Sequence, residues 1–127
     1  MFRNDLFTLQ LDYKFNKGDI ETLYLLALPI QRDLKSLRDL KAEHLPLLKS
    51  IRDNSFQAIE EKFNLPRTQV KALFHYHPTF YHLHIHFAHV NMTYAMGGYC
   101  CRGVLLEDVI DNIEIDGEYY QKKTMLC

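Results

Sequence analysis

The sequence has 127 residues, which favours a single domain built around one core of ordinary size. Hydrophobic residues make up 47% and charged residues 24%, the balance of a globular protein rather than a disordered one. The 15 basic and 16 acidic residues leave a formal charge of −1, which argues against a general binder of long nucleic acids or of anionic membranes.

The first part of the chain predicts two strands. Residues 8–15 alternate strictly between apolar and polar side chains, which predicts a half-buried strand with Asp12 and Lys14 side by side on its polar face. Residues 16–19 have the composition of a turn. Residues 22–30 form a nearly continuous apolar run, as expected for a strand that is buried on both faces.

Two helices are predicted further along the chain. From about residue 42 to 63, apolar side chains recur at helical spacing with charged residues between them. Pro46 falls in the first turn, where a missing backbone donor costs little, and the segment from Asn64 to Pro66 ends the helix. A second, shorter amphipathic helix is predicted over residues 105–113.

The remaining elements are predicted to be strands. Residues 70–77 and 81–90 are rich in aromatic and β-branched residues and are separated by Pro78. Residues 118–126 follow a turn and predict a last strand. The sum is an α+β domain with a mainly antiparallel sheet, one long helix and one shorter helix.

Histidine is the most unevenly distributed residue of the sequence. Six of the seven histidines lie between His75 and His89, and His82, His84 and His86 are spaced by two. On a strand, three side chains at this spacing project from the same face. The apolar residues that alternate with them are expected to face the core: Leu83, Ile85 and Phe87.

Three imidazoles on one face allow two kinds of chemistry. They suit a transition metal such as zinc, copper, iron or nickel. Alternatively, one imidazole acts as a nucleophile while its neighbours hold anionic oxygens. A third interpretation, structural histidines without a site, has to explain how several imidazoles are buried without a large desolvation cost.

Cysteine usage indicates an intracellular protein with reduced thiols. Cys100 and Cys101 are adjacent and Cys127 is the last residue, which is no disulfide framework. A zinc site that combines these cysteines with the histidines is disfavoured, because paired ligands usually have two to four residues between them. The sequence has no secretory pattern at its start and no apolar run near the roughly 18 residues of a membrane-spanning helix.

The segment HLHIHFA at residues 82–88 resembles the histidine-triad signature. The resemblance implies that the middle histidine, His84, attacks the α-phosphate of a nucleotide and forms a covalent nucleotidyl-histidine, which water then hydrolyses. It also implies that His82 and His86 orient the nucleophile and contact phosphate oxygens. No metal and no other cofactor is implied.

A wider resemblance is carried by four segments, at residues 36–48, 74–87, 105–114 and 119–124. They are similar to the catalytic domain of the scavenger mRNA decapping enzymes, which cleave N7-methylguanosine cap remnants and release N7-methyl-GMP. The resemblance implies a histidine-triad fold over residues 1–127 as a single catalytic domain, with a sheet that continues across a homodimer. The N-terminal lid domain of that family is expected to be missing from this chain.

The same resemblance implies roles for five further residues. Asp12 and Lys14 are expected near the cap base, where a carboxylate suits the cationic, N7-methylated guanine. His75, Thr79 and Arg102 are expected to contact the phosphates.

The expected function is therefore a hydrolase acting on phosphoric anhydride bonds, of the m7GpppX diphosphatase type, with capped dinucleotides or short capped RNA as substrates. Three alternatives stay open. One is a general histidine-triad hydrolase of dinucleoside polyphosphates or nucleoside phosphoramidates, and another is a nucleotide- or cap-binding module without turnover. The third is metal binding by the histidine cluster. The expected location is the cytoplasm, with the nucleus as an additional one, and no membrane partner is expected.

Overall fold

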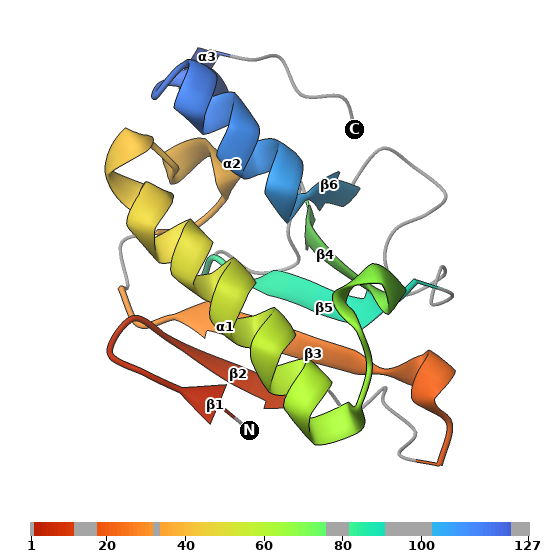
Figure 1. The fold of residues 1–127 in the computed structure, drawn as a ribbon. Helices are drawn as coiled ribbons and strands as arrows, with labels where there is room; N and C mark the ends of the chain where they lie inside the picture. The colour runs from red at the N-terminus through yellow and green to blue at the C-terminus, as the bar shows by residue number, and fades with distance from the viewer. Residues whose placement is uncertain (1, 12–17, 32–33, 76–81, 91–102, 123–127) are drawn as a thin grey trace.

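The computed structural model describes residues 2–11, 18–31, 34–75, 82–90 and 103–122 (Figure 1). These residues form six strands and three helices, together with short 3-10 turns. The strands are β1 (Phe2–Arg3), β2 (Phe7–Leu11), β3 (Tyr24–Pro29), β4 (Val70–His75), β5 (Ile85–His89) and β6 (Gly103–Leu105). The helices are α1 (Leu45–Phe63), α2 (Leu106–Ile115) and α3 (Tyr119–Lys122).

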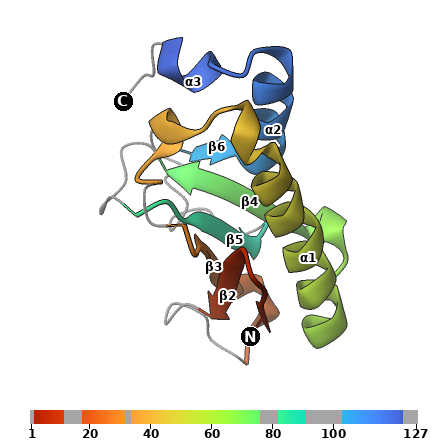
Figure 2. The same cartoon turned by 90° about the vertical axis from the view of Figure 1, so that its left-hand side faces the viewer.

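The strands form one sheet in the order β1-β2-β3-β5-β4-β6, and every pair is antiparallel. Helices α1 and α2 lie along the same face of this sheet (Figure 2). The strands alternate as expected, and the residues that face the helices form the core. Among the most buried of them are Phe7, Leu9, Leu25, Ala27, Phe74, Ile85 and Phe87. The opposite face of the central strands is therefore available to a functional site.

Helix α1 confirms the long predicted helix. Its buried residues recur every three or four positions, from Leu48 through Ile51 to Ile59, and face the sheet. Asn64 ends the helix in the left-handed conformation, with a φ of 53°, and its N–H donates to the Glu60 carbonyl. The predicted first turn, at residues 42–44, is a 3-10 turn instead.

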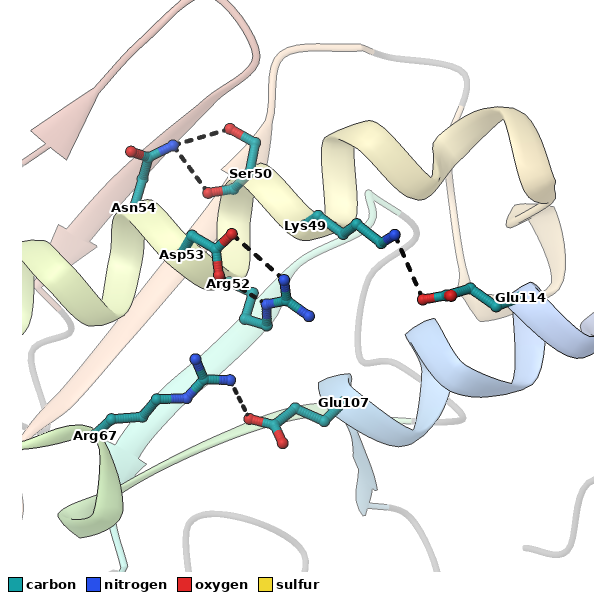
Figure 3. A network of polar contacts seen from close by, with 8 residues as sticks. All are labelled: Lys49, Ser50, Arg52, Asp53, Asn54, Arg67, Glu107 and Glu114. Carbon is teal, nitrogen blue, oxygen red and sulfur yellow. Dashed lines mark hydrogen bonds and ion pairs between the residues drawn. The ribbon is translucent and has the colours of Figure 1, made fainter.

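Ion pairs connect the solvent-facing sides of α1 and α2 (Figure 3). Lys49 Nζ lies 3.5 Å from Glu114 Oε1. Arg67, which follows α1, places its guanidinium 2.6 Å from Glu107 Oε1 and 4.7 Å from the centre of the Phe56 ring. Exposed pairs of this kind contribute little stability each, so the apolar contacts beneath them hold the two helices on the sheet.

The chain end differs from the sequence prediction. Residues 118–126 do not begin a strand, because Tyr119–Lys122 form the short helix α3, and residues 123–127 lie outside the described part. The adjacent aromatic residues Tyr119 and Tyr120 favour a strand when the sequence is considered alone. In the structure the Tyr120 ring is buried against the core and its hydroxyl accepts a hydrogen bond from Asn112 Nδ2 at 2.9 Å. Packing of one aromatic ring against α2 therefore decides the local structure.

The other strands are confirmed with shorter bounds, and two were not predicted. The 8–15 strand is described only to Leu11, and the 81–90 strand begins at Ile85. Strands β1 and β6, of two and three residues, escaped prediction because so short a segment shows no alternation. No helix among the described residues has the length and apolar character that a membrane crossing requires.

Helix α2 offers a matched pair of substitutions that tests the core. Ile113 is 1% exposed, whereas Ile115 in the same helix is 82% exposed. We expect Ile113→Ala to lower the free energy of unfolding by about 2–5 kcal/mol, since it leaves a cavity in the core. We expect Ile115→Ala to change it by less than about 0.5 kcal/mol. Urea titration of both variants measures this, and equal losses would contradict the placement of α2.

Candidate active site

The three clustered histidines gather at the central strands, beside the face that the helices leave open. His86 is on β5, with Leu26 of β3 and Leu73 of β4 as its cross-strand neighbours. Its sequence neighbours Ile85 and Phe87 are fully buried in the core on the helix side. Because strand residues alternate between faces, His86 projects from the open face.

Tyr24 holds the ring of His86. The Tyr24 hydroxyl lies 2.6 Å from His86 Nδ1, and the two rings meet edge to face with their centres 5.5 Å apart. Tyr24 has no solvent exposure, so its hydroxyl depends on partners within the protein. When this hydroxyl donates to Nδ1, the proton of the neutral imidazole is on Nε2.

His84 makes the contact that bears most directly on chemistry. Its Nδ1 lies 2.8 Å from the carbonyl oxygen of His82. A carbonyl only accepts hydrogen bonds, so Nδ1 carries the proton and Nε2 of the neutral ring keeps its lone pair. Burial lowers the pKa of His84 below its ordinary value of 6.5; the bond to the His82 carbonyl opposes this shift, and the nearby His82 ring adds to it. The ring is therefore a neutral base or nucleophile at neutral pH.

His82 lies before β5 rather than in it. Its Nε2 lies 3.1 Å from the carbonyl oxygen of Pro29, and the Leu83 N–H donates to the Leu34 carbonyl at 2.9 Å. The segment that carries His82 and His84 is therefore fixed by hydrogen bonds to the backbone carbonyls of Pro29 and Leu34 instead of strand pairing. The prediction of one strand through all three histidines is wrong in this detail, because β5 begins at Ile85.

The rings of His84 and His86 meet edge to face, with their centres 4.9 Å apart. Both side chains are buried, and His82 is half-buried. Hydrogen bonds to the Tyr24 hydroxyl, the Pro29 carbonyl and the His82 carbonyl offset part of the cost of this burial, at one nitrogen of each ring. The three imidazoles thus form a compact group. The carbonyl partners place the proton of a neutral His82 on Nε2 and that of a neutral His84 on Nδ1.

A cavity of about 590 Å³ opens beside His82. The other described residues that line it come from β1, from β2, and from the end of β3 and the residue after it: Arg3, Thr8, Leu28, Pro29 and Ile30. Sequence reasoning assigned no role to Arg3 or Thr8. Thr8 could have been found from the polar face of its strand, whereas Arg3 depends on a pairing that the sequence does not reveal.

Of the other five predicted site residues, only His75 belongs to the described part of the chain. Asp12, Lys14, Thr79 and Arg102 lie outside the described residues. His75 ends β4, where its backbone pairs in register with Gly103 of β6. The structure therefore brings together His82, His84 and His86, and the placement of the other five stays a prediction.

The metal interpretation requires a group of ligand side chains in the same region. Within the described ranges, no three His, Cys, Asp or Glu side chains are grouped so that they could hold a metal ion. Cys100 and Cys101, which the zinc interpretation needs, are outside those ranges.

Solved structures give a fold-level match. The chain resembles the crystal structure of the aprataxin ortholog Hnt3 from Schizosaccharomyces pombe, with a TM-score of 0.58 and 15% sequence identity. The match covers 89% of this chain and 65% of that one. At this identity the likeness shows the fold alone, which is the histidine-triad-like arrangement expected from the signature.

Sequence comparisons are more specific. Proteins named m7GpppX diphosphatase are 44% identical in Ascaris suum, 42% in Caenorhabditis elegans and 38% in Homo sapiens. These matches cover 94–96% of this chain but only 36–40% of each relative, so the chain spans well under half of their length. The family described as "Scavenger mRNA decapping enzyme C-term binding" matches residues 1–98. The chain therefore belongs to the family of the scavenger mRNA decapping enzyme C-terminal domain.

Proposed function

We propose that this chain is the catalytic part of a hydrolase that cleaves a phosphoric anhydride bond in m7GpppX-type cap remnants. The observation that carries the proposal is the 2.8 Å contact between His84 Nδ1 and the His82 carbonyl, which leaves the lone pair on Nε2. The names of the relatives, at 38–44% identity, support the same reaction and substrate class.

In the proposed reaction, His84 Nε2 attacks the phosphorus next to the methylated nucleoside. A nitrogen–phosphorus bond forms while the bond to the bridging oxygen breaks, and the electron pair leaves with the remaining nucleotide. Water then attacks the same phosphorus while the nitrogen–phosphorus bond breaks, and the electron pair of that bond returns to His84 Nε2. The water loses a proton to solvent, and N7-methyl-GMP is released. The resemblance assigns to His82 and His86 the roles of orienting the nucleophile and contacting the phosphoryl oxygens, on which charge grows in the transition state.

The resemblance supplies the rest of the proposed substrate site. Asp12 and Lys14 are proposed to contact the cap base, and His75, Thr79 and Arg102 to contact the phosphates. A homodimer and a cytoplasmic, and additionally nuclear, location are proposed on the same ground. The substrate class is a capped dinucleotide or a short capped RNA.

The first prediction concerns the nucleophile. We expect His84→Asn to reduce release of N7-methyl-GMP from m7GpppG at least about a thousandfold, because the asparagine side chain lacks the imidazole nitrogen that forms the covalent intermediate. His44→Asn is the matched control, since His44 is also a buried histidine but belongs to the turn before α1. Product release is followed by chromatography. Undiminished turnover in His84→Asn would exclude this nucleophile, and turnover that EDTA abolishes would exclude the metal-free mechanism.

The second prediction concerns pH. Since burial lowers the pKa of His84 below 6.5, the nucleophile stays neutral as the pH falls to that value. We expect kcat/KM to be retained at pH 6.5 and to fall only at lower pH, as His84 becomes protonated. A pH–rate profile, read beside an NMR titration of the His84 ring, measures both. An acidic limb above pH 6.5 that follows His84 would contradict the prediction.

The third prediction concerns Tyr24 as a positioning residue. We expect Tyr24→Phe to lower kcat about tenfold with little change in KM, because His86 loses the hydrogen bond that sets its ring orientation. Tyr120→Phe is the matched control: its hydroxyl is also buried and hydrogen-bonded, but to Asn112 on the helix side. Both variants should lose some stability, whereas only Tyr24→Phe should change kcat and the NMR tautomer signature of His86. Equal kcat values in the two variants would reject the positioning role.

A further inference from the structure

The peptide group between His82 and Leu83 is held from both sides. Its carbonyl oxygen is the atom that lies 2.8 Å from His84 Nδ1, and its N–H donates to the Leu34 carbonyl at 2.9 Å. A trans peptide group is planar, and its N–H and C=O point in opposite directions. The bond to Leu34 therefore fixes the orientation of the carbonyl that accepts the His84 proton.

A second peptide group extends these contacts to a carboxylate. The Leu34 carbonyl belongs to the same peptide group as the Lys35 N–H, which donates to Asp39 Oδ2 at 2.8 Å. Two peptide groups and three hydrogen bonds thus connect the Asp39 carboxylate with His84 Nδ1. Each donor points toward the carboxylate, so the dipoles of this Asp39–His84 relay are aligned head to tail.

The turn at residues 34–40, in which the relay begins, has a fixed geometry. Leu34 is 2% exposed and Leu40 is fully buried, so the residues at both ends are anchored in the core. Within the turn, Asp39 Oδ2 also accepts from the Ser36 N–H at 3.2 Å, and the Asp39 N–H donates to the Ser36 carbonyl at 3.0 Å. The carboxylate therefore has a defined position relative to the Leu34 carbonyl.

The relay ends at the ring on which charge develops in the proposed reaction. When His84 Nε2 bonds to phosphorus, the imidazole becomes positively charged and its Nδ1–H becomes a stronger donor. Hydrogen bonds in series polarise one another, and a carboxylate is a stronger acceptor than a neutral group. The His82 carbonyl is therefore a better acceptor than it would be without Asp39. At this distance the carboxylate also repels the anionic substrate less than one in direct contact with the ring would.

We propose that Asp39 is a positioning residue for His84, and that it acts through the two peptide groups of the relay. The inference rests on the proposed function, in which His84 is the nucleophile. Asp39 acts through the backbone and needs no contact with the substrate, so it affects kcat rather than KM.

The test uses the full chain with two substitutions at Asp39. We expect Asp39→Ala, which removes the acceptor, to lower kcat for m7GpppG about tenfold with little change in KM, the order of a hydrogen bond to a charged group. Asp39→Asn keeps an acceptor oxygen without the charge, so it should lower kcat about threefold, since charged hydrogen bonds are roughly twice as strong as neutral ones. In both variants, NMR titration should show a lower pKa of His84, because its charged form loses stabilisation.

Two control variants separate the relay from general effects on the fold. Gln121 Nε2 donates to the Leu40 carbonyl at 2.9 Å, so Gln121→Ala loosens the same turn from α3 without breaking the relay. Asp53→Asn removes the same charge from the outer side of α1, where Asp53 pairs with Arg52 (Figure 3). Both should leave kcat and the His84 titration unchanged, while urea titration measures the stability of every variant.

Unchanged kcat and an unchanged pKa of His84 in Asp39→Ala would overturn the inference. Equal losses of kcat in Asp39→Ala and Gln121→Ala would also overturn it, because the turn would then act only as a whole. The NMR titration needs no turnover, which separates the inference from the proposed function. A pKa of His84 that depends on Asp39, without hydrolysis of m7GpppG, would reject only the hydrolase. Hydrolysis that depends on His84 but not on Asp39 would reject only the inference.

Discussion

The antiparallel pairing of β3 with β5 is the contact on which the rest of the site depends. It sets Leu26 opposite His86, and it brings the Tyr24 hydroxyl to the His86 ring from 62 residues away in the chain. The end of β3 also presents the Pro29 carbonyl to His82. A slip of one residue would turn His86 toward the helices and bury it in the apolar core without these partners. The hydrophobic residues that face α1 and α2 therefore fix the register, and the register fixes the histidines.

The two faces of the sheet have different roles: one holds the apolar core and the other carries the histidines. One face is covered by α1 and α2 and holds the apolar core. On the other, a carbonyl or a hydroxyl contacts one nitrogen of each of the three imidazoles, which offsets part of the cost of burying them. The bond from His84 Nδ1 to the His82 carbonyl also sets the tautomer of His84, so that its Nε2 keeps a lone pair. The same hydrogen bonds therefore stabilise the buried rings and set the protonation of His84.

Alternation and spacing in the sequence determined the strands around residues 8–11 and 24–29 and the helix that ends at Phe63. They also determined that the apolar residues between the histidines face the core: Leu83, Ile85 and Phe87. The triad signature likewise identified the three histidines, because local spacing encodes which side chains share a face. Only the tertiary structure decided that Tyr24 and Pro29 contact them. Strand order and register arise from packing between distant segments, and no local pattern reports them. The same reason turned the expected last strand into a helix, since the burial of Tyr120 against α2 outweighs a local preference for strand.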